Sequence, residues 1–229
     1  MKKILTILLM LLFLAGCKEE DTILSERDKI VRYLTSRGLC SEEEIGDKIA
    51  VDPPFYTSFG NYAYRHIVNF YDADRASRPV IEWGDRVEVK FFNAYVFSGS
   101  EPSDNAIFWS NIPEVIIKLG GKTGNTLGWS TEPLIIEIGT TKLVAGLEYA
   151  IPGCREADSL QVYMTANLAY GKNPVGTVPQ NSMQAWYMRI EKVIKERYEI
   201  YSRDEICICG TRSSVCYNFV YYRGGGAYS

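Results

Sequence analysis

The sequence is poor in the residues on which metal sites and acid–base chemistry depend. Its 229 residues include a single histidine, His66, which excludes any site that needs two imidazoles. Charges of the two signs nearly balance, with 25 Lys and Arg against 28 Asp and Glu and a formal charge of −3. No run of like charge is long enough to form the basic stripe of a nucleic-acid binder. We therefore expect a mildly acidic protein with no nucleic-acid partner.

The overall composition is that of a globular protein. Hydrophobic residues make up 46% and charged residues 23%, which excludes a disordered or multi-span membrane chain. The length is near the top of the single-domain range, so we expect one domain with additions or at most two. Aromatic residues reach 13% and include 16 tyrosines, enough to line a concave apolar surface.

The N-terminus has the features of an export signal. Two lysines precede an apolar run from Ile4 to Ala15, which is too short to span a bilayer but suits the core of a signal peptide. The end of the run, Leu14-Ala15-Gly16-Cys17, resembles the bacterial lipobox. The resemblance implies cleavage after residue 16 and lipidation of Cys17. The alternative is an ordinary secretory signal with a cysteine near the cut.

The residues after Cys17 bear on the location of the protein. Lys18-Glu19-Glu20-Asp21 is most simply a solvated tether, and we assign residues 17–24 to it. The same stretch is similar to the acidic surface-export signals of some Gram-negative lipoproteins. We therefore expect a cell-envelope protein anchored by lipid to the outer membrane, on its periplasmic side or at the cell surface.

Five further cysteines, Cys40, Cys154, Cys207, Cys209 and Cys216, form an odd set for an oxidising compartment. The predicted C-terminal hairpin places Cys209 and Cys216 on strands that flank its turn, so we predict a disulfide between them, with Cys207 as the alternative partner. Cys40 and Cys154 stay unpaired in this prediction. The three C-terminal thiols lack a CxxC spacing and a nearby histidine, so we expect no metal site.

Hydrophobic periodicity predicts a mainly antiparallel α+β fold. Capping residues and apolar faces indicate helices over three segments, and alternation indicates strands over the others. The expected helices cover residues 25–38, 111–119 and 142–150; the expected strands cover 62–71, 87–96, 134–138, 160–166 and 184–193, followed by a hairpin over 199–222.

Residues 80–194 resemble the FKBP-type peptidyl-prolyl isomerase domain. The most specific piece is Leu168-Ala169-Tyr170-Gly171, followed by the loop to Pro179 and the closing strand 184–190. Residues 142–148 are similar to the start of the family's helix, and the distance from Gly146 to Gly171 matches the family's without a gap. Residues 84–89 match the first core strand, and residues 108–111 are similar to the family's phenylalanine-aspartate-serine motif.

The resemblance implies an antiparallel sheet wrapped around a short helix, with an N-terminal helix and strand (residues 25–79) and a C-terminal extension (195–229) added. It implies a pocket in which the Tyr170 hydroxyl and the Val144 N–H donate to substrate carbonyls. The remaining pocket residues implied are Phe91, Phe108, Trp109, Leu134, Leu143, Leu147, Val178 and Trp186.

Several of these positions depart from the family pattern. Trp109 replaces the pocket aspartate, Leu147 replaces the tryptophan of the pocket floor, and Trp186 replaces a phenylalanine on the closing strand. Phe91 replaces a tyrosine of the family pattern, and Leu134 replaces a phenylalanine. Each of the first two losses would cost catalysis about 1–2 kcal/mol, on the scale of a single buried contact, and together a factor on the order of 10².

The resemblance implies a membrane-anchored peptidyl-prolyl cis-trans isomerase that assists the folding of proline-containing exported polypeptides. Rotation about an X-Pro bond breaks no covalent bond, so it needs no cofactor. The alternative is a non-catalytic FKBP-like binding or chaperone module with a degenerate pocket.

Overall fold

A computed structural model describes residues 22–40, 56–60, 62–119, 130–139, 144–195, 199–210 and 213–223. The chain divides into two compact units, Met1–Val193 and Ile194–Ser229. The predicted signal peptide, Cys17 and the acidic residues 18–21 lie outside the described residues. Among the residues that are described, no helix has the length and apolar character needed to cross a bilayer.

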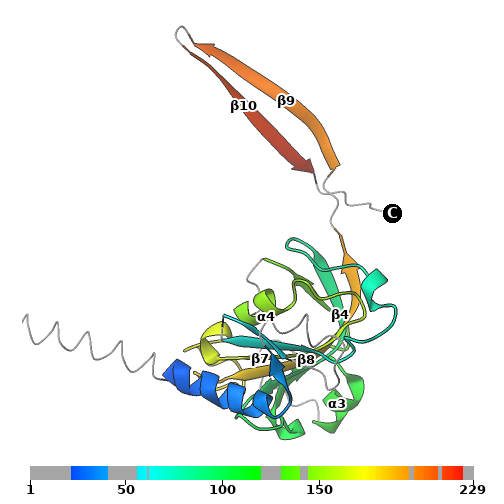
Figure 1. Cartoon of the computed structure of the whole chain (residues 1–229), viewed down its shortest axis with the longest axis vertical. Coiled ribbons are helices and arrows are strands. Elements are labelled where there is room, and N and C mark those ends of the chain that lie inside the picture. Colours follow the sequence, from blue (N-terminus) through cyan, green and yellow to red (C-terminus); the bar gives the residue numbers. More distant parts are fainter. Residues whose placement is uncertain are drawn as a thin grey trace, which may run out of the picture. The chain divides into compact units, whose positions relative to one another are not determined.

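The first unit is built on one sheet whose strand order is β1-β2-β3-β7-β8-β4-β5, with β6 pairing to β4 (Figure 1). The recorded pairings are antiparallel, except that β1 and β2 are parallel. The predicted antiparallel α+β architecture is therefore confirmed. The strands are β1 (Leu39–Cys40), β2 (Tyr56–Phe59), β3 (Ala63–Ile67), β4 (Arg86–Val96), β5 (Ile107–Ser110), β6 (Leu134–Glu137), β7 (Ser159–Met164) and β8 (Gln184–Ile194).

Strand β4 changes its pairing partner along its length. Its first half pairs with β6 and its second half with β5. Val87 and Val89 are buried, but the next buried side chain is Phe92, so the inward-facing alternation shifts by one residue. The side chain of Asn111 bonds to the backbone at this shift: its Oδ1 accepts from the N–H of Phe92 at 2.9 Å, and its Nδ2 donates to the carbonyl of Lys90 at 2.8 Å.

Helix α4 (Ala145–Ala150) packs against β3 and β7, as Figure 1 shows for β7. Gly146 allows this close approach. A Cβ atom at that position would lie 2.6 Å from Sδ of Met164 on β7, so any larger residue would push the helix away from the sheet. Helix α3 (Pro113–Lys118) begins with a proline in its first turn, where the missing N–H costs nothing.

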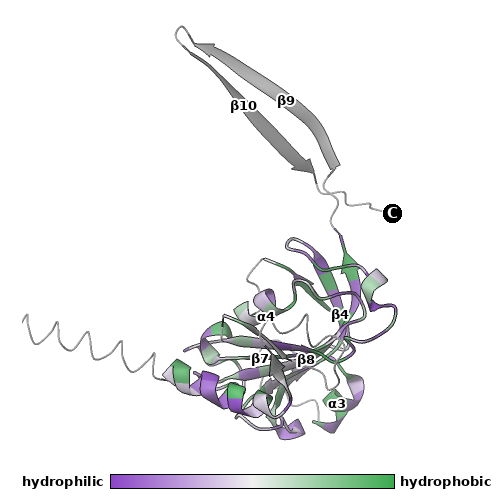
Figure 2. Ribbon diagram, viewed as in Figure 1, coloured by the Kyte–Doolittle hydropathy of each residue, from purple (hydrophilic) through white to green (hydrophobic). Residues whose placement is uncertain are grey.

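A helix over residues 22–35 precedes the sheet. The helix carries both hydrophilic and hydrophobic residues (Figure 2). Its buried face includes Ile30 and Leu34, both 0% exposed. They pack with Tyr64, Tyr163 and other aromatic residues in a core cluster separate from the main one. Burial of two such side chains stabilises the fold by about 1.5–3 kcal/mol each. The helix is therefore an integral part of the first unit.

The predicted strands and helices are present, with changed ends. The strand expected over 62–71 is limited to β3, which is buried on both faces. Three short segments were not predicted: β1, β2 and β5. Single turns of 3-10 helix also occur at Arg75–Ser77, Asp104–Ala106 and Ala166–Leu168.

The second unit is a hairpin of β9 (Glu199–Gly210) and β10 (Ser213–Arg223). This confirms the predicted hairpin, although its turn is shorter than expected. The register places Cys216 opposite Cys207, and Cys209 opposite Ser214. Diagonal positions two residues apart lie about 7–8 Å from each other, beyond the reach of a disulfide. The register therefore favours Cys207, the alternative partner, over Cys209 as the partner of Cys216, and the disulfide itself stays a prediction.

Candidate functional site

Four aromatic rings meet at the centre of the main core, and three of them were predicted from the sequence. Trp186 on β8 stacks on Phe92, with centroids 5.8 Å apart and planes at 21°. Trp109 and Phe108 on β5 contact the edge or face of Trp186, at 5.7 and 6.0 Å. Such offset and edge-to-face pairs are the favoured aromatic geometries. The sheet thus gathers residues that are up to 94 positions apart into one aromatic cluster.

Trp186 is the centre of this aromatic cluster and is 0% exposed. Its indole N–H donates to Oε1 of Gln184 at 2.9 Å. Leu147 of α4 is also fully buried in the same core. The core beneath this part of the sheet is therefore closed by one indole from β8 and one aliphatic side chain from the helix.

Phe91 is not part of the cluster, contrary to the prediction. Its side chain is 43% exposed, and it lies 5.6 Å from the ammonium group of Lys90 on the outer side of the sheet. Because the alternation of β4 shifts by one residue where Asn111 bonds to it, Phe92 faces the core instead of Phe91. Phe92, and not Phe91, is the residue of β4 that stacks on Trp186.

Tyr170 borders the cluster from the loop that follows the 3-10 turn Ala166–Leu168. Its ring lies 6.1 Å from that of Phe108 at 66°. Burial raises the pKa of its hydroxyl above the ordinary value for tyrosine. No described residue hydrogen-bonds that hydroxyl. Gly171 follows with φ of +57°, a backbone conformation that glycine adopts without strain.

Val144 caps the N-terminus of α4 and is 2% exposed. Its carbonyl accepts from the N–H of Leu147 at 3.1 Å. Its own N–H has no acceptor among the residues that the structure describes, as is usual for the first N–H groups of a helix. Leu143, the neighbouring predicted pocket residue, lies outside the described residues.

The predicted pocket residues form a closed floor and an accessible rim. Phe108, Val144, Leu147, Val178 and Trp186 are all at most 4% exposed. The half-buried residues packed on them are Trp109, Leu134 and Tyr170. A ligand that approaches the cluster would therefore meet the rim and not the floor, which corrects the expectation of an open pocket lined by all of these side chains.

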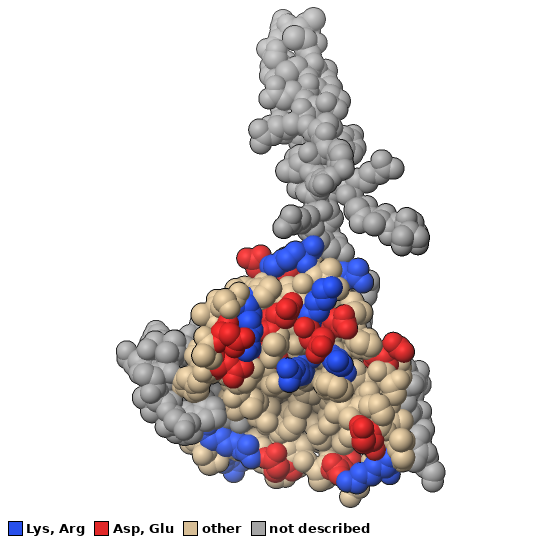
Figure 3. Space-filling model, turned by 90° about the vertical axis from the view of Figure 1, so that its right-hand side faces the viewer, with Lys and Arg blue, Asp and Glu red and all other residues tan. Residues whose placement is uncertain are grey.

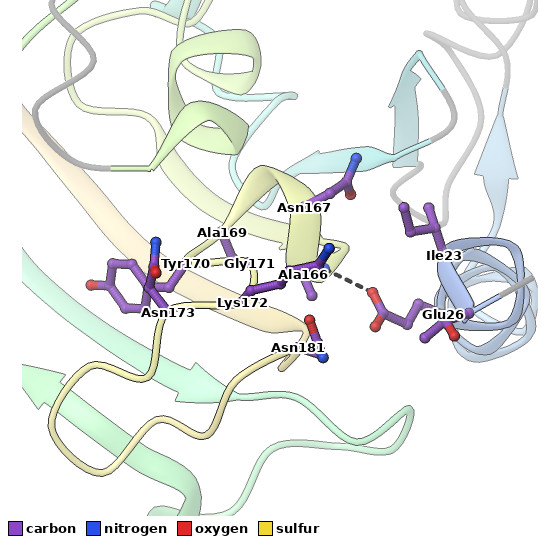
Figure 4. A pocket seen from close by; sticks show the side chains of 11 residues that line it. Ile23, Glu26, Ala166, Asn167, Ala169, Tyr170, Gly171, Lys172, Asn173 and Asn181 are labelled. Atoms are coloured by element: carbon purple, nitrogen blue, oxygen red, sulfur yellow. Dashed lines mark hydrogen bonds between the residues drawn. The ribbon is translucent and has the colours of Figure 1, made fainter. Parts of the chain in front are cut away.

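A cleft of about 540 Å³ lies beside Tyr170 (Figure 4). One wall is the start of the N-terminal helix, with Ile23 and Glu26, and the other is the chain around Asn173 and Asn181. The sequence analysis missed this cleft.

Within the described residues, no group of three His, Cys, Asp or Glu side chains lies close enough to hold a metal ion. Lys and Arg side chains alternate with Asp and Glu on the face shown in Figure 3. No broad patch of one sign covers that face. Cys154 is buried with a free thiol, as predicted.

Comparison with known proteins gives a limited result. No family model matches the chain, and no curated protein matches it. Among solved structures, the chain is similar to the three FKBP domains of wheat FKBP73, with a TM-score of 0.45 and 14% sequence identity. The match covers 62% of this chain and 52% of that one, so it spans about half of the wheat structure.

Proposed function

We propose that this chain is an FKBP-type peptidyl-prolyl cis-trans isomerase acting on proline-containing exported polypeptides. The observation that carries the proposal is the rim of Trp109, Leu134 and Tyr170 over an aromatic floor. One hydrogen-bond donor, the Tyr170 hydroxyl, adjoins this apolar surface and has no partner among the described residues. The Val144 N–H belongs to the buried floor, so only a proline that enters deeply would reach it. A proline ring and its flanking carbonyls match such a surface.

The reaction requires little beyond such a surface. The barrier to rotation about a peptide bond is ~18–20 kcal/mol because the twisted amide loses its conjugation. The twisted carbonyl is less polar than the planar one, so apolar surroundings favour it relative to water. Each ~1.4 kcal/mol of this preference accelerates rotation tenfold. In this proposal Tyr170 donates a hydrogen bond to the carbonyl before the proline, and Trp109 covers the ring.

A second candidate, a non-catalytic binding module, is favoured by the burial of the floor. Leu147 and Trp186 have no exposed surface, so a proline ring would have to displace side chains to enter deeply. Binding on the rim alone would hold a proline segment without twisting it. Trp109, in the place of the family's aspartate, would then act as a stacking platform.

Exchange NMR of a four-residue X-Pro peptide separates the two candidates. The full chain in detergent is compared with its Trp109→Asp variant, and a detergent blank gives the uncatalysed rate. Wild-type acceleration of cis–trans exchange supports the isomerase. Binding of the peptide without acceleration, weakened in Trp109→Asp, supports the binding module. A wild type that neither binds the peptide nor accelerates exchange contradicts both.

We further propose that Cys17 carries a lipid anchor, on the strength of the lipobox-like sequence Leu14-Ala15-Gly16-Cys17. The anchor would hold the protein in the cell envelope, where exported polypeptides fold. Labelled palmitate should be incorporated by the wild type in a Gram-negative host and not by Cys17→Ala. A wild type that incorporates no palmitate and fractionates as a soluble protein would contradict this proposal.

A further inference from the structure

The cleft beside Tyr170 joins two distant parts of the chain. The buried carboxylate of Glu26, 6% exposed, accepts a hydrogen bond from the N–H of Ala166 at 2.8 Å and so ties the N-terminal helix to the loop (Figure 4). Ile23 stands on the same side of the helix as Glu26, and Asn167 and Asn181 lie on either side of this hydrogen bond in the figure. A volume of about 540 Å³ is within the range of ligand sites.

The loop wall of the cleft is held in one conformation by its own backbone. The N–H of Gly171 donates to the carbonyl of Ala166 at 2.8 Å, and the N–H of Asn181 donates to the carbonyl of Gly171 at 2.7 Å. Asn181 has φ of +54°, a left-handed conformation that asparagine tolerates better than most residues. The wall is therefore shaped before any ligand arrives, which lowers the entropic cost of binding.

The side chains of the wall present amides to the cleft. Asn173 and Asn181 line it, and their carboxamides have no hydrogen-bond partner among the described residues. The oxygen of Asn167 accepts from the Thr165 hydroxyl, which leaves its NH₂ group to donate. A carboxamide offers both a donor and an acceptor, the same pair that each peptide unit of a polypeptide main chain offers in return.

Tyr170 borders both the aromatic cluster and the cleft. Its ring contacts that of Phe108 in the cluster, while Tyr170 and the residues that follow it line the cleft (Figure 4). A polypeptide whose proline rests on the rim could therefore continue directly into the cleft. Pairing with main-chain amides is independent of sequence, which suits a protein that acts on many clients.

We infer that this cleft binds the main chain of the client polypeptide beside its proline, through the amides of Asn167, Asn173 and Asn181. The inference rests on the proposed function and extends it, because it makes the N-terminal helix a wall of the substrate site. It predicts that clients are recognised over a segment longer than the proline and its immediate neighbours.

The test compares three peptides that contain the same X-Pro pair: one of four residues, one extended to eight residues on the N-terminal side, and one extended to eight residues on the C-terminal side. Calorimetry with the full chain in detergent should show that one of the extended peptides binds at least fivefold more tightly than the short one. The double variant Asn173→Ala/Asn181→Gly should reduce this ratio to about one. Glycine at position 181 keeps the left-handed backbone accessible. Asn105→Ala, an exposed asparagine elsewhere, is the matched control and should keep the wild-type ratio.

The outcomes separate this inference from the proposed function. Acceleration of exchange in the short peptide, with a long-to-short affinity ratio of one in the wild type, overturns the inference and leaves the isomerase standing. A long-to-short affinity ratio that stays at the wild-type value in the double variant also overturns the inference. A proline-free eight-residue peptide provides an independent check, since its binding should be lost in the double variant even if no isomerisation occurs. Binding of an uncharged oligosaccharide in place of both peptides would overturn the inference as well.

Discussion

The indole N–H of Trp186 donates to Oε1 of Gln184 at 2.9 Å, and both side chains are fully buried. Because an indole nitrogen can only donate, the amide must turn its oxygen toward the ring. The amide NH₂ then faces away and has no acceptor among the described side and main chains. This pair orients the ring on which Phe92, Phe108 and Trp109 pack.

A double-mutant cycle should detect this hydrogen bond. Gln184→Leu leaves the indole N–H buried without an acceptor, which costs about 1–3 kcal/mol of unfolding free energy. Trp186→Phe removes the donor and some packing. In the Trp186→Phe background, Gln184→Leu should lower the unfolding free energy by less than it does in the wild type, with a coupling energy of roughly 1 kcal/mol. Denaturant unfolding of the four proteins gives the coupling, and additive losses would show that the pair is not coupled.

His66 should titrate below the ordinary histidine value. Burial lowers its pKa, and the hydrogen bond from Nδ1 to Oε1 of Gln161 at 3.2 Å opposes the shift. As the only histidine of the chain, it gives one set of imidazole NMR signals, whose shift with pH yields the pKa directly. A value at or above about 6.5 would contradict the burial found here.

The lowered pKa of His66 makes the free energy of unfolding depend on pH. The unfolded chain binds a proton at His66 more tightly than the folded chain, so stability is lost as the pH falls from the unfolded pKa toward the folded one. The variant His66→Gln should lose this part of the pH dependence.

Glu26 should give the pH dependence of stability the opposite sign from that of His66. Burial raises its pKa, although the hydrogen bond from Ala166 lowers it in part. The folded chain therefore holds this proton more tightly than the unfolded chain, and the contribution of Glu26 to stability falls as the pH rises above the unfolded value. Glu26→Gln keeps an acceptor for Ala166 without the charge. Denaturant unfolding should find the variant more stable than the wild type at pH 7, with the difference shrinking toward pH 4.

The hairpin register predicts one disulfide in the second unit. Cys207 and Cys216 are directly opposite each other, at a separation that a disulfide can bridge. Peptide mapping without reduction should recover this pair from exported protein. Cys209→Ser should retain it and Cys207→Ser should lose it. Recovery of a Cys209–Cys216 pair from the wild type would show that the register is different.

Local patterns were sufficient to predict most of the sheet, because alternation in β4, β7 and β8 reflects one buried face. The patterns failed where the cause was distant in sequence. The side chain of Asn111 bonds to the backbone of β4 about twenty residues earlier, at the point where the buried alternation of β4 shifts by one residue. Because of this shift Phe92 is buried and Phe91 is exposed. Short strands such as β5 carry too few residues to show a period.

The site was predicted in part for the same reason. The resemblance noted in the sequence predicted that Tyr170, Val144 and the core aromatic residues lie together, and all of them lie in or against the main core. Their degree of burial depends on the sizes of facing residues, such as Leu147 and Trp186, which no local pattern contains. The cleft was not predictable, since its two walls are far apart in the sequence and meet where Glu26 accepts a hydrogen bond from Ala166, 140 positions away.

The most direct test of the central claim is the rate of X-Pro exchange with and without the Tyr170 hydroxyl. The full chain should accelerate cis–trans exchange of a short X-Pro peptide, and Tyr170→Phe should lower kcat/KM by a few-fold to about tenfold, as expected for one neutral hydrogen bond of ~0.5–1.5 kcal/mol. Tyr71→Phe, at an exposed tyrosine outside the site, should leave the rate unchanged. A wild-type rate equal to that of the detergent blank, or equal losses in both variants, would contradict the claim.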